Sequence, residues 1–198
     1  MSDIRICFVG DSFVNGTGDE SALGWVGRLC RAAHAQGVPV TGYNLGIRRD
    51  TSRDVCRRLE AECLPRQPSD CDGRIVLSCG VNDTTWEAGA TRLSLDESLT
   101  NLDEMLAFAS RYACLFVGPP PVDDDGHNRR IATLSDAFAD RCRKRGVVFI
   151  DLFGPLVDDA AYRRAVRAGD GAHPDSRGYA RLAEVIGSDA GWWFRQGR

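Results

Sequence analysis

Five short apolar runs alternate with segments of helical periodicity along the chain. The runs are rich in Val, Ile, Leu, Phe and Cys, which predicts strands buried on both faces: Ile4–Val9, Val38–Leu45, Arg74–Cys79, Ala113–Val117 and Val147–Asp151. Between them, apolar residues recur at helical spacing, as in Leu95, Leu99, Leu102 and Leu106. This alternation predicts an α/β fold in which one doubly wound parallel sheet of about five strands carries helices on both faces.

Length and composition fit a single domain over residues 1–198. The chain is 43% hydrophobic and 27% charged, as expected of an ordinary globular protein, and no linker or internal repeat divides it. Thr51 or Ser52 is the expected N-cap of a helix over Asp54–Cys63. The prolines and acids of the stretch 119–126 predict a solvated loop.

Charge and hydropathy exclude two classes of partner. The net charge is −3 and no basic stripe alternates with aromatic residues, so a nucleic-acid partner is not expected. No apolar run approaches the ~20 residues that span a bilayer. The N-terminus has no signal-peptide pattern, and we therefore expect a cytoplasmic protein.

Eight cysteines raise the question of a metal site or disulfides. The sequence contains no C-x-x-C motif and no cysteine paired with a histidine at zinc-like spacing. Small buried thiols in a reducing compartment are the expected interpretation, with neither metal nor organic cofactor.

Polar clusters follow the expected strands. The first strand ends in Gly10-Asp11-Ser12, the second in Asn44-Leu45-Gly46 and the third in Gly80-Val81-Asn82-Asp83. In an open parallel sheet, ligands bind at the carboxyl ends of the strands, near the point where the strand order reverses. If the order is flavodoxin-like, 2-1-3-4-5, Ser12 and Asn82 become neighbours.

His173 is the histidine with the clearest chemical pattern. His34 falls on an amphipathic helix and His127 in the acidic loop, whereas His173 follows Asp170 by three residues in a Gly- and Pro-containing turn. That spacing lets a carboxylate hold the imidazole in the tautomer that leaves Nε2 free to accept a proton. Serine, histidine, aspartate and candidate oxyanion donors at one edge of a sheet indicate acyl transfer.

Taken together, four motifs resemble the blocks of the SGNH hydrolase superfamily, also called GDSL esterases and lipases. They occur in the family's order and span residues 10 to 174: Gly10-Asp11-Ser12, Gly46 after Asn44-Leu45, Gly80-Val81-Asn82-Asp83 and Asp170-Gly171-Ala172-His173-Pro174. The resemblance implies that Ser12 is the nucleophile, His173 the base and Asp170 its orienting carboxylate. It also implies oxyanion donors from the Ser12 and Gly46 N–H groups and the Asn82 side-chain amide.

Two departures from the family pattern concern the surroundings of these residues. Phe13 replaces leucine in the first block, and its side chain is expected to pack beneath the loop. Arg48 and Arg49 stand in the second block where small residues are more common. This second departure bears on the substrate and leaves the reaction unchanged.

The predicted function is therefore serine-dependent hydrolysis of a carboxylic ester, with short-chain or acetyl esters as the expected substrates. Trp86 and Phe13 are candidates for the floor of an acyl site, and Arg48 is a candidate contact for an anionic leaving group. A lysophospholipase or an acyl thioesterase of the same family remains an alternative. Outside that class, the alternatives are a nucleotide- or FMN-binding protein with a phosphate loop at Gly10, Gly16 and Gly18, and a non-catalytic carbohydrate-binding module.

Overall fold

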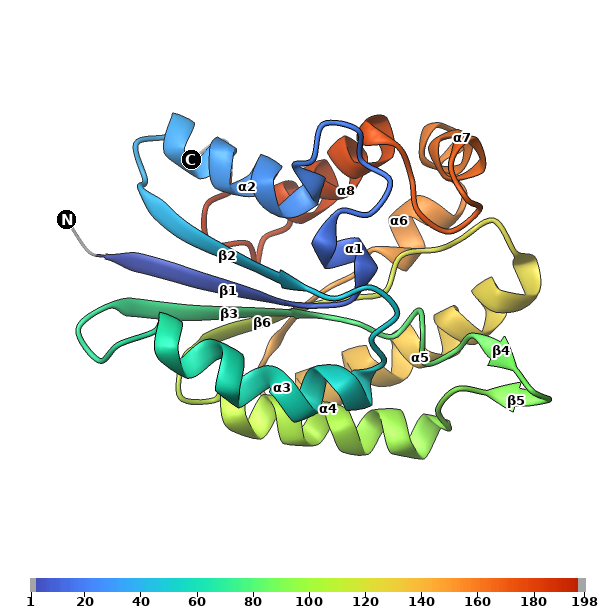
Figure 1. The fold of residues 1–198 in the computed structure, drawn as a ribbon, viewed down its shortest axis with the longest axis horizontal. Helices are drawn as coiled ribbons and strands as arrows, with labels where there is room; N and C mark the ends of the chain where they lie inside the picture. The colour runs from blue at the N-terminus through green and yellow to red at the C-terminus, as the bar shows by residue number, and fades with distance from the viewer. Residues whose placement is uncertain (1–2, 196–198) are drawn as a thin grey trace.

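The computed structural model describes residues 3–195, which form a five-stranded parallel sheet between two layers of helices (Figure 1). The strands are β1 (Ile4–Gly10), β2 (Val40–Gly46), β3 (Asp72–Ser78), β6 (Ala113–Val117) and β7 (Val148–Ile150). Their order in the sheet is β2-β1-β3-β6-β7, and every pairing is parallel. The five expected strands and the flavodoxin-like order are confirmed.

Two helical layers cover the sheet, one on each face (Figure 1). One layer contains α2 (Gly24–Ala35) and α8 (Ser176–Ser188), with the shorter α1 (Ser12–Asn15), α6 (Phe153–Val157) and α7 (Ala160–Ala168) toward the carboxyl ends of the strands. The other layer contains α3 (Ser52–Cys63), α4 (Leu95–Ala109) and α5 (Asp125–Lys144). A 3-10 turn over Leu64–Arg66 follows α3. Each layer buries its own apolar cluster against the sheet.

Several helices begin at a residue whose side chain caps the first turn. Thr51 caps α3 in a capping box with Asp54, and Ser94 caps α4 in the same way with Glu97. The expectation of a loop over 119–126 is wrong at its end, because α5 already begins at Asp125. The Asp124 carboxylate accepts a hydrogen bond from the His127 N–H at 2.6 Å, so the acidic run starts a helix.

Three strands end at the same level of the sheet. Gly10 of β1 pairs with Gly46 of β2 on one side and with Ser78 of β3 on the other. The chain leaves β1 for β2, then crosses to β3 on the opposite side, so the order reverses between β1 and β3. The residues that follow these strands therefore meet at the switch point, where ligands bind in folds of this type.

A small hairpin, which the sequence did not predict, lies beside this edge. It pairs β4 (Trp86–Glu87) with β5 (Ala90–Thr91) in antiparallel register. The Arg49–Glu87 ion pair at 3.1 Å joins it to the segment after β2, and the Arg92 guanidinium donates to the Arg49 carbonyl at 2.9 Å. These contacts place Trp86 next to the strand ends.

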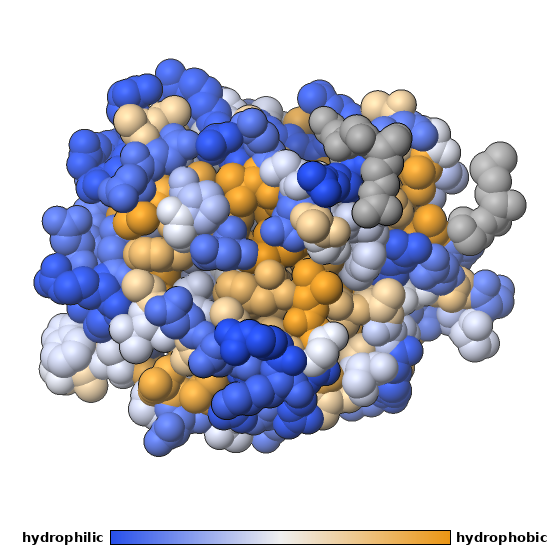
Figure 2. Space-filling view, turned by 180° about the vertical axis from the view of Figure 1, so that it is seen from behind, coloured by the Kyte–Doolittle hydropathy of each residue, from blue (hydrophilic) through white to orange (hydrophobic). Residues whose placement is uncertain are grey.

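Apolar side chains also reach the surface. Seen from behind the view of Figure 1, apolar residues gather across the middle of the molecule with hydrophilic residues around them (Figure 2). Ile47 and Trp86 are the exposed apolar residues that follow the strand ends, and 59% of Trp86 is accessible. Within residues 3–195, no helix has both the length and the apolar character needed to cross a membrane.

Candidate active site

The segment Gly10-Asp11-Ser12 turns the chain sharply out of β1. A side chain at Gly10 would place its Cβ 1.9 Å from the Ser78 carbonyl oxygen, so the close approach of β1 and β3 requires glycine. Asp11 then caps α1 by accepting the Phe13 N–H at 2.9 Å. This short turn places Ser12 at the first position of α1, at the end of the sheet.

Ser12, His173 and Asp170 form a continuous chain of hydrogen bonds. His173 Nε2 lies 2.7 Å from Ser12 Oγ, and His173 Nδ1 lies 2.8 Å from Asp170 Oδ2. The second carboxylate oxygen, Oδ1, accepts the N–H groups of Ala172 at 3.0 Å and His173 at 2.8 Å. Asp170 thus shapes the turn with one oxygen and orients the imidazole with the other. This arrangement can activate a serine hydroxyl for nucleophilic attack.

The charge state of Asp170 suits that role. Burial disfavours its ionised form, but hydrogen bonds from the His173 backbone and ring and from the Ala172 N–H outweigh burial and lower its pKa to about 2. The carboxylate is therefore ionised at every pH above strong acid. An ionised Asp170 accepts a hydrogen bond from His173 Nδ1–H, which leaves the Nε2 lone pair facing Ser12.

The pKa of Asp11, unlike that of Asp170, is raised. Its side chain is fully enclosed, and burial together with the nearby carboxylates of Asp83 and Asp50 raises its pKa to about 7. Asp83 is also buried and has a raised pKa, mainly because of burial, although Ser52 N–H and Ser98 Oγ donate to it. Asp11, next to Ser12 in the chain, therefore has two further acids, Asp83 and Asp50, near it.

Phe13 packs under the site. Its ring centroid lies 5.1 Å from that of His173, and the side chain is buried in a cluster with Val81, Val122 and Ile131. The imidazole thus rests on an apolar layer that restricts its rotation. The structure places Phe13 beneath the loop that carries Ser12, where it supports His173.

The predicted oxyanion donors Asn82 and Gly46 differ in whether they still have a hydrogen to donate to a substrate. Asn82 follows β3, and its Nδ2 donates one hydrogen to the Asp50 carbonyl at 3.0 Å, while the second hydrogen of the amide has no acceptor among residues 3–195. The Gly46 N–H donates to Asn44 Oδ1 at 3.0 Å, so it already has an acceptor within the protein. A Cβ at Gly46 would lie 2.1 Å from the Asn15 nitrogen, and glycine at this position therefore lets β2 approach α1.

The turn after Gly46 lies against both neighbouring strand ends. The Ile47 N–H donates to the Gly10 carbonyl at 3.0 Å, and the Asp50 N–H donates to the Ile47 carbonyl at 3.3 Å. Arg49 adopts φ +69°, a left-handed conformation that is uncommon for a residue with a side chain. Within residues 3–195, the N–H groups of Arg48 and Arg49 donate to no acceptor.

The candidate substrate contacts lie at the rim of the site. Trp86 is exposed four residues after Asn82, with the Arg130 guanidinium carbon 5.8 Å from its ring centroid. Arg48 is exposed and forms no ion pair with the acids of the described chain. Both side chains are accessible to a bound molecule.

The three glycines considered as a phosphate loop are packed against protein. A Cβ at Gly16 would lie 2.9 Å from Gly24 Cα, and one at Gly18 would lie 3.1 Å from the Pro174 carbonyl oxygen. Together with the contact of Gly10 with Ser78, these positions explain the glycines without a phosphate ligand. Among the described residues, no three His, Cys, Asp or Glu side chains are grouped as a metal site would need.

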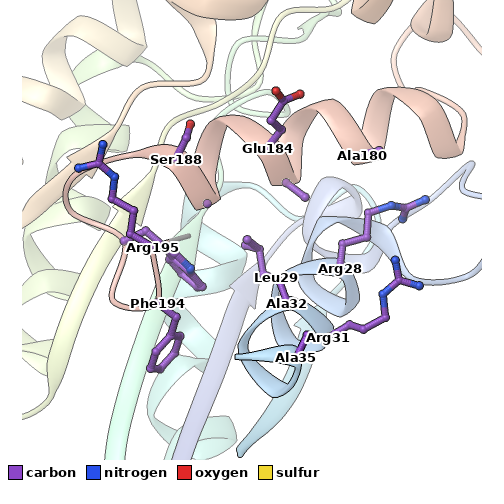
Figure 3. A pocket seen from close by; sticks show the side chains of 13 residues that line it. Arg28, Leu29, Arg31, Ala32, Ala35, Ala180, Glu184, Ser188, Phe194 and Arg195 are labelled. Atoms are coloured by element: carbon purple, nitrogen blue, oxygen red, sulfur yellow. The ribbon is translucent and has the colours of Figure 1, made fainter. Parts of the chain in front are cut away.

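A groove of about 670 Å³ lies elsewhere, between α2, α8 and the segment that follows α8 (Figure 3). Leu29, Ala32 and Ala35 of α2 line one side, and Ala180 and Glu184 of α8 line the other. None of the residues that line it belongs to the Ser12 site. The eight cysteines carry free thiols, four buried and four half-buried, and burial raises the pKa of Cys30 to about 11.

Sequence reasoning missed two parts of the site. The first is the β4–β5 hairpin, whose two-residue strands are too short to show a periodic pattern. The second is Arg58 of α3, whose guanidinium donates to the carbonyls of Gly10 and Leu45. Because 24 of the 25 basic residues are arginines (all but Lys144), composition gave no reason to select this one.

A parallel α/β sheet with a hydrogen-bonded Ser–His–Asp group at its switch point defines a hydrolase of the SGNH type. A family model described as the GDSL-like lipase/acylhydrolase family matches residues 8–181, and the chain belongs to that family. It is accordingly a carboxylic ester hydrolase. No curated protein matches the chain.

Solved structures share the fold over nearly the whole chain. A lipase/acylhydrolase from Enterococcus faecalis has a TM-score of 0.75 and 24% identity, covering 92% of this chain and 93% of its own. An acetyl xylan esterase variant from Geobacillus stearothermophilus has a TM-score of 0.80 and 20% identity, covering 100% and 98%. An alpha/beta hydrolase from the metagenome of Lake Arreo, Spain, has a TM-score of 0.77 and 17% identity, covering 100% and 99%.

Proposed function

We propose that the protein hydrolyses short-chain carboxylic esters, with acetyl esters as the preferred class, through an acyl-enzyme formed on Ser12. The observation that carries this proposal is the 2.7 Å contact between Ser12 Oγ and His173 Nε2, with Asp170 on the far side of the imidazole. His173 takes the Ser12 proton as Oγ attacks the ester carbonyl, and returns it to the leaving alcohol. Water then attacks the acyl-enzyme with His173 again acting as base.

The negative charge that develops on the carbonyl oxygen needs donors at the strand ends. The Ser12 N–H is one, because the first N–H groups of a helix have no acceptor within it. The free hydrogen of Asn82 Nδ2 is the second. The Gly46 N–H is engaged by Asn44, so we assign the third donor to the turn that follows, where the N–H groups of Arg48 and Arg49 have no acceptor within residues 3–195.

A short acyl group fits the packing beneath the nucleophile. Phe13 and Val81 are 2% and 5% exposed, and with Val122 they fill the space under Ser12 and His173. A long acyl chain would have to displace this cluster or lie across the surface. The acetyl xylan esterase named above, which shares the fold, is consistent with an acetyl ester as substrate.

The alcohol part of the ester would leave past the rim of the site. Trp86 offers an exposed aromatic face there, and Arg48 offers a guanidinium without an ion-pair partner in the described chain. Both contact the leaving group in our proposal, and neither takes part in the chemistry.

Hydrolysis of a soluble acetyl ester by two serine variants tests the proposal. Ser12→Ala should lower kcat by roughly 10³-fold or more, as expected for loss of a triad nucleophile. Ser135→Ala is the matched control, because Ser135 is also 4% exposed but lies on α5. Ser135→Ala should retain full activity. Activity of Ser12→Ala within tenfold of the wild type would refute the assignment.

A further inference from the structure

Arg58 binds three acceptors that belong to three different segments. Its Nη2 donates to the Gly10 carbonyl at 2.8 Å, its Nη1 to the Leu45 carbonyl at 2.9 Å, and its Nε to the Asp50 carboxylate at 2.7 Å. The side chain is 16% exposed, so these bonds are largely shielded from water. A planar guanidinium can satisfy three acceptors in fixed directions, which an ammonium on a flexible stem cannot do in the same way.

Each acceptor lies next to a part of the reaction site. Gly10 is separated from Ser12 only by Asp11, and its carbonyl also accepts the Ile47 N–H at 3.0 Å. Leu45 precedes the turn that brings Arg48 and Arg49 to the rim. A single side chain thus ties together the ends of β1 and β2.

The third contact leads to Asn82. Arg58 holds Asp50 by its carboxylate, and the Asp50 backbone carbonyl accepts the Asn82 Nδ2 hydrogen at 3.0 Å. Because that bond fixes one amide hydrogen, it also fixes the direction of the other. The path from the guanidinium to the oxyanion donor therefore runs through one residue.

Electrostatics around Arg58 favour the same role. The buried Asp11 side chain lies close enough to both Asp50 and the buried Asp83 for their charges to act on it. The Asp50 side chain is itself 15% exposed and is paired with Arg58. Without the guanidinium, the largely buried Asp50 carboxylate would lose its counter-charge and its hydrogen-bond donor, and we expect it to turn toward solvent. That rotation would move the Asp50 backbone.

We propose that Arg58 is a positioning residue for ester hydrolysis: through Asp50 it aims the free N–H of Asn82 at the oxyanion, and through Gly10 it holds the turn that carries Ser12. This inference rests on the proposed function, because it assumes that Asn82 stabilises the oxyanion. Arg58 does not touch the substrate.

The test compares Arg58→Met and Arg58→Lys with Asn82→Ala and with the double variants. Asn82→Ala should lower kcat by about 10²–10³-fold with KM nearly unchanged, as for loss of one oxyanion donor. Arg58→Met should lower kcat by roughly 10- to 100-fold, also with little change in KM, and Arg58→Lys by less. In the Asn82→Ala background, Arg58→Met should cost only about threefold more, because the amide that it positions is already missing.

Arg74→Met is the matched control for loss of a half-buried arginine. Arg74 is 18% exposed and pairs with Asp72 at 2.7 Å, at the end of β3 away from Ser78. The Arg74→Met substitution should lower the melting temperature of the protein without changing kcat. If Arg58→Met does not fold, Arg58→Lys carries the same comparison.

The outcomes separate the two proposals. If Asn82→Ala keeps normal kcat, the oxyanion assignment fails, and this inference fails with it. If Asn82→Ala lowers kcat but the Arg58 variants do not, only the inference about Arg58 is overturned. Fully multiplicative losses in the double variant would likewise overturn it, since they would show that Arg58 acts independently of Asn82.

Discussion

His173 Nε2 lies 2.7 Å from Ser12 Oγ, although 161 residues separate the two along the chain. The contact exists because the interior strand β1 ends at the carboxyl edge of the sheet, and the turn before α8 returns to that edge. The Phe13 ring packs against the His173 imidazole and helps to hold it beside Ser12. The chemistry we propose depends on this pair more than on any other.

Replacement of His173 should remove activity that replacement of another histidine leaves intact. His173→Gln lacks a base that can take up the Ser12 proton, and kcat should fall by roughly 10³-fold or more. The control is His34→Gln, since His34 is exposed on α2 and only its Nε2 contacts a carbonyl, that of Val40. Equal rates of ester hydrolysis in the two variants would show that the base has been misassigned.

Asp11 should make the protein less stable as pH rises from about 4 to about 7, between its unfolded and folded pKa values. Its pKa is raised to about 7 in the folded state and is near 3.8 in the unfolded chain, so between these values only the folded state holds the proton. Unfolding then releases a proton. The free energy of unfolding therefore falls by up to about 1.4 kcal/mol for each unit of increase in pH.

Chemical denaturation at pH 5.0 and pH 7.5 measures this effect. Asp11→Asn keeps an oxygen that can accept the Phe13 N–H but does not titrate. The free energy of unfolding should therefore fall more between these pH values in the wild type than in Asp11→Asn. Parallel changes in the two proteins would mean that Asp11 is ionised in the folded state throughout.

The left-handed backbone conformation of Arg49 predicts that a glycine variant is more stable than an alanine variant at this position. At an ordinary exposed site, alanine is more stable than glycine by up to about 1 kcal/mol. At φ +69° the order should reverse, with Arg49→Gly more stable than Arg49→Ala by about 1 kcal/mol, because only glycine adopts this conformation freely.

Both variants lose the ion pair with Glu87, so their difference isolates the backbone effect. A gap of about 1 kcal/mol corresponds to roughly 2–4 °C in melting temperature for a chain of this size. A higher melting temperature for Arg49→Ala than for Arg49→Gly would contradict the assigned turn.

The buried cluster beneath Ser12 predicts a preference for small acyl groups. Across esters of one alcohol with acyl chains from acetyl to palmitoyl, kcat/KM should be highest from acetyl to butyryl and fall for longer chains. Phe13→Ala should shift the optimum toward longer chains, because it removes the largest side chain of the cluster. Faster hydrolysis of palmitoyl than of acetyl esters by the wild type would contradict a short acyl site.

The sheet was predictable from sequence because its signals are local. Each strand is a short apolar run, and the polar residues that follow β1 and β3 mark the switch point once the order is assumed. Thr51 or Ser52 was predicted as the cap of a helix, and Thr51 is the residue that caps it, because capping depends on a few adjacent residues. These features need no knowledge of distant contacts.

The remaining features depend on contacts between distant segments. The acceptor of the Gly46 N–H, the conformation of Arg49 and the three acceptors of Arg58 appear only when β1, β2 and α3 are assembled. His127 was assigned to a loop, yet it lies in the first turn of α5, where its Nε2 contacts Thr84 Oγ1 and the Val81 carbonyl. The Asp124 cap could have indicated that helix, but the adjacent prolines and glycine favoured a loop.

Covalent labelling shows directly whether Ser12 is the activated nucleophile. A serine-directed fluorophosphonate reacts only with a hydroxyl that a neighbouring base activates, and mass spectrometry of the digested protein locates the adduct. We expect one adduct, on the peptide that contains Ser12, with labelling lost in His173→Gln and in Ser12→Ala. An unlabelled wild type, or an adduct on another serine while ester hydrolysis proceeds, would show that Ser12 is not the nucleophile.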